Sequence, residues 1–303
     1  MDRDPVLINT LEELKSLVDL VARQDISLGD IKPPLYIDIE GEQLSRHGKI
    51  SLMTVLVYSS DYNMYPHIIN IYSLGLAAFS TAGKLGKSFK DILESPDVLK
   101  VFFDVRNDSD ALYAHYGVKL QGVRDIQLME SARRLNTHGR RYLAGLSKCI
   151  EEAPFAFNKR ERDEWRVCKA TGEALWNPRK GGSYSVFEAW PLSDDIIKYC
   201  VGDVQYLPML YYKYRCQTVR WNNLIAEASQ TRVYLSQTAD YQPNGPGRAL
   251  SPWNAEQNQL LDEWNAPPPV TDYFSYDSDR DWSPDDSNDY EDWTRADWQG
   301  PPS

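Results

Sequence analysis

The sequence predicts a mixed α/β domain that is followed by an acidic tail. Strand-like and helix-like apolar patterns alternate through the first part of the chain, and the composition turns to Asp, Ser, Pro, Asn and Gly near its end. With 42% hydrophobic residues, a chain of 303 residues can bury a full core. We therefore expect one folded domain at residues 1–237 and a disordered tail at residues 238–303.

The first expected elements are a helix and a pair of strands. Thr10 and Glu13 fit a capping box, and the apolar residues that follow recur at helical spacing, so a helix should end near Gln24. Two apolar runs, at residues 35–39 and 50–57, are separated by a glycine-containing turn. This arrangement is typical of a strand hairpin.

The later elements continue the alternation and lead to a long helix. Ser193 is a good N-cap, and the two acids after it suit the positive end of a helix dipole, so a helix should run through Leu207, where Pro208 can kink it. The patterns before it predict strands at residues 67–71 and 100–103, a short strand passing into a helix at 122–134, and helices at 87–93, 108–115, 140–151 and 160–175.

The net charge of −11 is located in the tail. From Asp240 to the end there are fourteen acidic residues, three arginines and no lysine, so this segment carries the whole excess. The preceding residues hold equal numbers of acids and bases. A nucleic-acid partner for the folded part is therefore compatible with the charge, and for the tail we expect a role in solubility.

Cysteine usage and hydropathy bear on where the protein works. The four cysteines lack CxxC pairing, which favours reduced thiols over a disulfide framework or a zinc site. The N-terminal residues lack a charged start followed by an apolar stretch, and no run of about 18 apolar residues could cross a bilayer. We expect an intracellular protein of the cytoplasm or nucleus, without a membrane partner.

Two acids lie one residue apart on the first strand of the hairpin. Asp38 and Glu40 project from the same face because side chains alternate along a strand. Buried like charges repel each other unless a cation lies between them. The pair therefore predicts a site for a hard divalent ion, Mg²⁺ or Mn²⁺.

Two further acidic features accompany this pair. An apolar strand at residues 100–103 runs into an acid-rich helix start, where Asp104, Asp108 and Asp110 are alternatives for a third acid, and N-capping is another reading of Asp108. Tyr199 and Asp203 are four residues apart, so phenol and carboxylate share one helix face.

Together these features resemble the DEDDy branch of the DnaQ-like, ribonuclease H-like exonucleases, the group that contains ribonuclease D. The resemblance covers residues 7–213 and is closest to exonuclease-domain proteins of the Egalitarian type and their fungal relatives, through residues 101–112 and 176–183. It implies a ribonuclease H-like fold, with a mixed central sheet flanked by helices. It also implies that Asp108 is the acid of the second motif.

The resemblance implies a two-metal reaction. Asp38, Glu40, Asp108 and Asp203 would hold two divalent ions, Mg²⁺ or Mn²⁺, around the terminal phosphodiester. Tyr199 would orient the attacking water, since a phenol with a pKa near 10 is a poor general base. The implied activity is 3′→5′ hydrolysis of single-stranded RNA or DNA with a free 3′ end, which releases nucleoside monophosphates.

One position departs from the family pattern. Trp190 stands before Pro-Leu where the family usually has an arginine, which puts a supporting or substrate contact in doubt. Arg179 or Lys180 could supply that contact instead.

A basic surplus marks the region before the last motif. Residues 132–180 contain twelve Lys and Arg against six Asp and Glu, with Trp165 and Trp176 among them, which suits phosphate contacts and base stacking. An ordinary solvated helix face with core aromatics is the alternative. The candidates for nucleic-acid contact are Arg133, Arg134, Arg140, Arg141, Arg179 and Lys180.

A second functional hypothesis is an exonuclease fold that serves as an RNA-binding or scaffolding module without meaningful turnover. The complete set of acids favours the enzyme, since degenerate members commonly lose a metal ligand.

Overall fold

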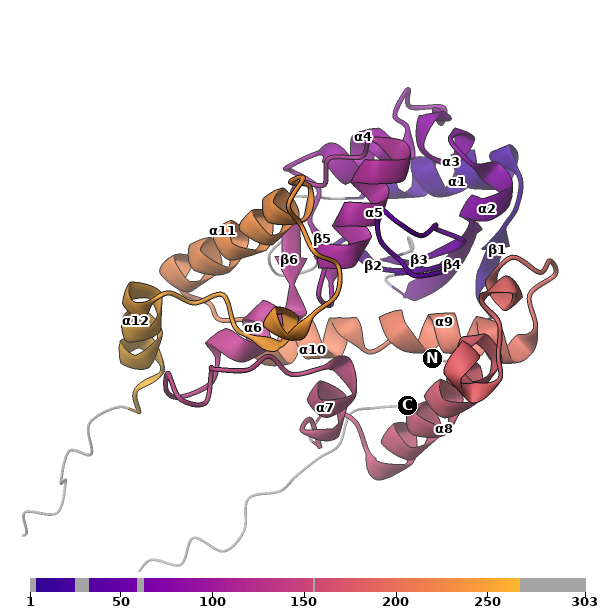
Figure 1. Cartoon of the computed structure of the whole chain (residues 1–303). Coiled ribbons are helices and arrows are strands. Elements are labelled where there is room, and N and C mark those ends of the chain that lie inside the picture. Colours follow the sequence, from indigo (N-terminus) through magenta and orange to yellow (C-terminus); the bar gives the residue numbers. More distant parts are fainter. Residues whose placement is uncertain (1–3, 25–32, 59–62, 155, 268–303) are drawn as a thin grey trace, which may run out of the picture. The chain divides into compact units, whose positions relative to one another are not determined.

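The computed structural model describes residues 4–24, 33–58, 63–154 and 156–267. Its centre is a six-stranded mixed sheet (Figure 1). In spatial order the strands are β1 (Val6–Ile8), β4 (Met64–Asn70), β3 (Leu52–Tyr58), β2 (Leu35–Glu40), β5 (Lys100–Phe102) and β6 (Val123–Asp125). The β2, β3 and β4 strands are antiparallel, and the other pairings are parallel.

Helices cover both faces of this sheet (Figure 1). On one face, α1 (Leu11–Ala22), α4 (Phe89–Glu94) and α5 (Arg106–Tyr116) share a buried apolar cluster with alternate residues of β2, among them Ile37 and Ile39. On the other face, α6 (Ile126–Ala132) and α10 (Leu207–Tyr214) share a second cluster with Tyr36. Because successive side chains of β2 point to opposite faces of the sheet, this strand contributes to two separate apolar layers of the core.

The remaining helices are added around this framework. The long helix α8 (Lys159–Trp176) packs against α9 (Asp194–Val204), and α11 (Val219–Ser236) packs against β6 and α5. None of the described helices combines the length and apolarity needed to cross a membrane. The shorter elements are α2 (Ile71–Leu74), α3 (Ala77–Ser80), α7 (Leu146–Glu151), α12 (Ala255–Asn265), and the 3₁₀ turns η2 (Pro178–Lys180), η3 (Tyr184–Phe187) and η4 (Pro246–Ala249).

The structure confirms the predicted α/β class and adjusts several elements. The capping box of Thr10 and Glu13 opens α1, as predicted. The long helix expected from Ser193 is two helices, because α9 ends at Val204 and α10 begins at Leu207, with a proline in its first turn. The helix predicted at residues 140–151 is shorter, and the sequence patterns gave no prediction for β1 or α11.

The predicted boundary between residues 237 and 238 is wrong, because the folded unit extends to Ala266. Residues 238–266 return to the domain: the Leu143 amide donates to Ala249, and the buried Trp253 indole donates to Ser131 Oγ at 3.0 Å. Composition alone concealed this return, since these aromatic side chains stand singly among polar residues. The disorder predicted for residues 268–303 lies outside the described residues.

A buried arginine anchors this C-terminal segment. Arg140 has no exposed surface and donates to the Asn258 side chain and carbonyl at 3.0 and 2.9 Å, and to Asp262. Both acceptors lie on α12, whose Leu261 is also fully buried. The Arg140 charge is thus satisfied by a helix that the sequence assigned to the tail.

We predict that a chain ending at residue 266 has the stability of the full chain, whereas a chain ending at residue 237 is destabilised by at least about 3 kcal/mol. Removal of α12 leaves the Arg140 guanidinium buried without its partners, and breaking buried pairs costs about 3–5 kcal/mol. Urea unfolding monitored by circular dichroism measures the difference. Equal midpoints for the two truncated chains would contradict the anchoring role of this segment.

Candidate active site

The central strand β2 presents two carboxylates at its C-terminal end. Asp38 and Glu40 share one face of the strand, while Ile37 and Ile39 between and before them enter the core on the other face. The neighbouring strand β5 pairs with Leu35 and the residue after it and ends at Phe102. The carboxylates therefore lie beside the point where the chain leaves β5 and enters α5.

Helix α9 brings a third carboxylate to this pair. It packs across β2, β3 and β4 and carries Asp203, which is only 5% exposed. One carboxylate oxygen from each of Asp38, Glu40 and Asp203 lies within 4.8 Å of the other two. The structure thus joins two motifs that are more than 160 residues apart in the chain.

The acid-rich start of α5 contributes Asp108 to the same region. Asp108 is buried in the first turn of the helix, and this burial, then the charge of Asp38, raises its pKa. It lies outside the tight group of three oxygens. The alternative reading of Asp108 as an N-cap is wrong, because the N-cap of α5 is Val105.

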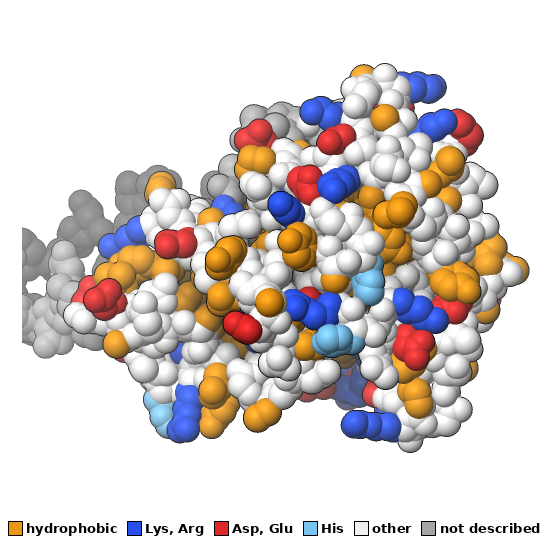
Figure 2. All heavy atoms as spheres, turned by 45° about the horizontal axis from the view of Figure 1, so that its top comes forward, with side chains coloured by type: hydrophobic (Ala, Val, Ile, Leu, Met, Phe, Trp, Pro, Cys, Tyr) orange, Lys and Arg blue, Asp and Glu red, His pale blue; other side chains and the backbone are white. Residues whose placement is uncertain are grey.

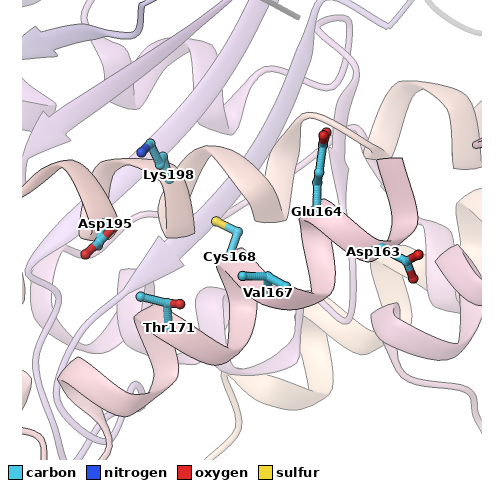
Figure 3. A pocket seen from close by; sticks show the side chains of 7 residues that line it. All are labelled: Asp163, Glu164, Val167, Cys168, Thr171, Asp195 and Lys198. Carbon is cyan, nitrogen blue, oxygen red and sulfur yellow. The ribbon is translucent and has the colours of Figure 1, made fainter. Parts of the chain in front are cut away.

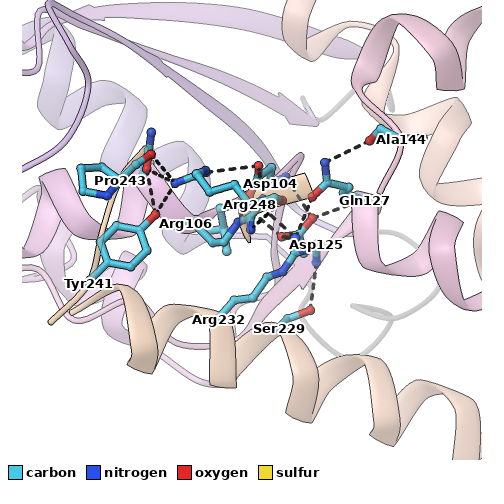
Figure 4. A network of polar contacts seen from close by, with 12 residues as sticks. Asp104, Arg106, Asp125, Gln127, Ala144, Ser229, Arg232, Tyr241, Pro243 and Arg248 are labelled. Carbon is cyan, nitrogen blue, oxygen red and sulfur yellow. Dashed lines mark hydrogen bonds and ion pairs between the residues drawn. The ribbon is translucent and has the colours of Figure 1, made fainter. Parts of the chain in front are cut away.

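The two alternative acids have other partners. Asp104, with a positive φ of 61°, accepts two hydrogen bonds from Arg106 and one from Arg248 at 3.3 Å (Figure 4). Burial opposes ionisation there, but the guanidinium groups lower the pKa of Asp104 to about 2. Asp110, which is fully buried, accepts from the Arg46 amide and guanidinium at 2.8 and 2.7 Å. Both acids hold loops in place.

Burial and mutual repulsion alter the acidity of the clustered carboxyl groups. Burial raises the pKa of Asp38 to about 7, and the Asp203 charge adds to this effect. Burial and the charge of Asp38 raise the pKa of Glu40 well above its ordinary value, and burial is the largest cause for Asp108 as well. The group thus behaves as carboxylates that have been brought together without enough positive charge.

Tyr199 lies one helical turn before Asp203, as its spacing predicted, and is 4% exposed. Its ring centroid is 6.2 Å from those of both Trp176 and Phe187. Helix α8 comes close because residue 172 is glycine: a Cβ there would lie 2.3 Å from Tyr199 Cδ2. Burial, then the charge of Glu40, raises the pKa of Tyr199, so the phenol keeps its proton.

Sequence reasoning missed Lys169, which reaches the carboxylates from α8. Its ammonium forms an ion pair with Asp203 Oδ2 and lies 4.0 Å from the centroid of the Tyr199 ring. Burial lowers the pKa of Lys169, but the charges of Asp203, Glu40 and Asp38 raise it above its ordinary value. The available signal was the spacing of Trp165, Lys169, Gly172 and Trp176, which marks the face of α8 that meets α9.

The residues present fit a divalent ion. Asp203 Oδ1 is buried and lacks a hydrogen-bond partner among the described residues. Such an atom is costly to bury unless a further group satisfies it. The clustered ligand atoms are all carboxylate oxygens, the type that Mg²⁺ and Mn²⁺ prefer.

Two of the six basic candidates for nucleic-acid contact are used inside the fold. The prediction that Arg140 contacts nucleic acid is wrong, because its guanidinium is fully buried and anchors α12. Arg134 donates to both carboxylate oxygens of Glu130 and to the Gly139 and Tyr142 carbonyls. The exposed candidates are Arg133, Arg141, Arg179 and Lys180.

Two tryptophans and a lysine that the sequence analysis singled out have partners inside the fold. Trp165 is buried and donates to the Gly202 carbonyl at 3.0 Å, so it joins α8 to α9. Trp190, at the position of the usual family arginine, packs partly buried in the apolar cluster that contains Phe187 and Leu192. Lys180, considered as a substitute for that arginine, pairs with Glu173 at 2.9 Å.

The surface charges and one cavity of the described residues were compared with the predicted site. On the face shown in Figure 2, acidic and basic side chains are interspersed, and no single basic stripe crosses it. A cavity of about 420 Å³ lies between α8 and α9, lined by Asp163, Glu164, Val167, Cys168, Thr171, Asp195 and Lys198 (Figure 3). None of the predicted site residues lines this cavity.

Comparisons with known proteins identify the family of the chain and its fold. The 3′-5′ exonuclease family model matches residues 5–217. Mouse piRNA biogenesis protein EXD1 is 33% identical over 96 residues, which span 32% of this chain and only 15% of the mouse protein.

Solved structures of ribonuclease D share the fold. The Trypanosoma brucei enzyme in complex with RNA U12 superposes with a TM-score of 0.64 at 18% identity, covering 86% of this chain and 79% of that one. Escherichia coli ribonuclease D gives 0.50 at 16% identity, covering 78% and 52%. The predicted ribonuclease H-like fold is thereby confirmed. Because the family match covers most of the chain, the chain belongs to the 3′-5′ exonuclease family.

Proposed function

We propose that this protein is an active, metal-dependent 3′→5′ exonuclease that releases nucleoside monophosphates from single-stranded nucleic acid. The observation that supports this most is the convergence of carboxylate oxygens of Asp38, Glu40 and Asp203 within 4.8 Å of one another. One Asp203 oxygen is also buried and has no hydrogen-bond partner within the ranges that the structure describes. A binding module would have no need to maintain such mutually repelling groups.

In this proposal Asp38, Glu40, Asp108 and Asp203 hold two divalent ions, Mg²⁺ or Mn²⁺. When bound, the ions would activate water and stabilise the attacking and leaving oxygens. Asp38 and Glu40 are fixed by the central strand, whereas α5 and α9 supply the other two acids from opposite sides of the sheet. Ligands on separate rigid elements favour a fixed geometry.

Tyr199 and Glu40 take the roles that orient the reactants. The raised pKa of Tyr199 keeps the phenol protonated, so it positions the attacking water through its hydroxyl and does not remove a proton. Glu40 would contact the terminal 3′-hydroxyl, which restricts hydrolysis to chain ends. The exposed Arg133, Arg141, Arg179 and Lys180 are the candidates for phosphate contacts.

We propose RNA as the first substrate to test. The Trypanosoma brucei relative was solved with RNA, and the mouse relative is described as a piRNA biogenesis protein. The cytoplasm or nucleus suits such a substrate, and Cys149 and Cys200 are buried free thiols, consistent with a reducing compartment.

We predict that wild-type protein with Mg²⁺ or Mn²⁺ shortens 5′-labelled single-stranded RNA from its 3′ end. Asp38→Asn should lower the rate by at least about 100-fold, because losing even the supporting partners of metal ligands costs about 10–100-fold. A labelled DNA oligomer tests the preferred sugar. Asp163→Asn, which removes an exposed carboxylate on α8, is the matched control and should retain activity.

A chelator should abolish the ladder in every active sample. RNA binding without shortening under either metal would favour the scaffolding hypothesis over the enzyme.

We predict that Asp38→Asn stabilises the metal-free protein relative to wild type increasingly as the pH rises from about 5 to about 8. The pKa of Asp38 is about 7 in the folded state and about 3.9 in the unfolded state. The contribution of Asp38 to the free energy of unfolding is therefore fully present below about pH 3.9 and is lost as the pH rises through about 7. Melting temperatures in chelator measure this trend. A difference between the two proteins that does not vary with pH would contradict it.

We predict that Gly172→Ala lowers kcat by about 10–100-fold, because the added methyl group would displace the Tyr199 ring. Gly145→Ala is the control, since its Cβ would meet no atom within 4 Å. In a double-mutant cycle, Gly172→Ala should cost little further activity in a Tyr199→Ala background, which has room for the methyl group. Independent, additive losses would refute an effect through Tyr199.

A further inference from the structure

The ion pair between Lys169 and Asp203 lies inside the proposed metal site. The Lys169 ammonium contacts Asp203 Oδ2 and lies 4.0 Å from the centre of the Tyr199 ring. Burial raises the pKa of Asp38 and of Glu40, and the positive charge of Lys169 partly offsets this effect. A lysine side chain here therefore contacts or influences four of the five proposed reaction residues. The inference that follows rests on the proposed function.

Lys169 and a metal ion would compete for the carboxylate of Asp203. The carboxylate has one oxygen paired with Lys169 and one buried oxygen that has no hydrogen-bond partner in the described part of the chain. An ion bound through the free oxygen would lie within a few ångströms of the ammonium, and like charges at such distances repel strongly in a buried site. Metal binding thus requires Lys169 to move.

The side chain of Lys169 is 32% exposed, whereas that of its partner Asp203 is 5% exposed. A lysine carries its charge on four flexible methylene groups, so the ammonium can leave the carboxylate while α8 stays packed on α9. The hydrogen bond from Trp165 to the Gly202 carbonyl and the contact between the rings of Trp176 and Tyr199 hold α8 against α9.

The charge of the reacting groups indicates where the ammonium goes. The four negative charges of the carboxylates equal the four positive charges of two divalent ions. With both ions bound, the positive charge of Lys169 would therefore be uncompensated. A phosphodiester carries one negative charge and would lie against the same ions. We propose that Lys169 couples metal binding to substrate binding: its ammonium competes with the metal ion for Asp203 in the free protein and pairs with the terminal phosphodiester when nucleic acid is bound.

The test is a comparison of Mn²⁺ affinity with and without an oligomer, measured by titration calorimetry. The oligomer is a short single-stranded RNA with a phosphorothioate at its last linkage, which keeps the negative charge and resists hydrolysis. In the wild-type protein this oligomer should raise the Mn²⁺ affinity about 10-fold, within the usual range of coupling between sites. An oligomer whose last linkage is a neutral methylphosphonate should give little or no increase.

Two substitutions at position 169 separate charge from packing. Lys169→Met keeps a long side chain over Tyr199 but removes the charge, so Mn²⁺ should bind about 10-fold more tightly without oligomer, and the gain on adding oligomer should vanish. Lys169→Arg keeps the charge and should retain the coupling. Lys198→Met removes a positive charge from the exposed face of the neighbouring helix and should behave as wild type.

The outcomes distinguish this inference from the proposed function. Equal Mn²⁺ affinity and equal coupling in Lys169→Met and wild type would overturn the inference while leaving a working metal site. Absence of Mn²⁺ binding from wild type and Lys169→Met, with and without oligomer, would overturn the proposed metal site and the inference together. Binding that appears only in Lys169→Met would support competition at Asp203.

Discussion

The repulsion among the clustered carboxylates beside the central strand is the constraint on which the rest of the structure depends. Asp38 and Glu40 belong to an inner strand that is hydrogen-bonded to both neighbours, so the backbone cannot move these charges apart. Only protonation or a bound cation can relieve their repulsion. Two apolar layers stabilise that strand from either side. Lys169 and raised pKa values are the structural signs that the repulsion is only partly relieved.

Local periodicity was sufficient to predict the parts of the site that lie on one element. Alternation along a strand placed Asp38 and Glu40 together, and a four-residue gap placed Tyr199 beside Asp203. Spacing alone did not choose among the acids around α5. That choice depends on arginines that pair with the two acids flanking Asp108. Arg106 is near in the sequence, but Arg46 and Arg248 are distant from the acids that they contact.

The errors in prediction have the same origin, since tertiary partners are invisible to composition. Arg140 belongs to a basic surplus and still lies fully buried, because α12 returns across more than a hundred residues to pair with it. Lys169 was one of many charges on an amphipathic helix. Its distinction comes from α9, which packs against α8 and carries Asp203.

The chain order of the site residues has a consequence for biosynthesis. Asp38, Glu40 and Asp108 leave the ribosome early, but Asp203 follows much later, and Arg248, which braces the start of α5 through Asp104, comes later still. Domains assemble as their residues emerge during translation. A growing chain therefore carries an incomplete candidate site until Asp203 and Arg248 have both emerged.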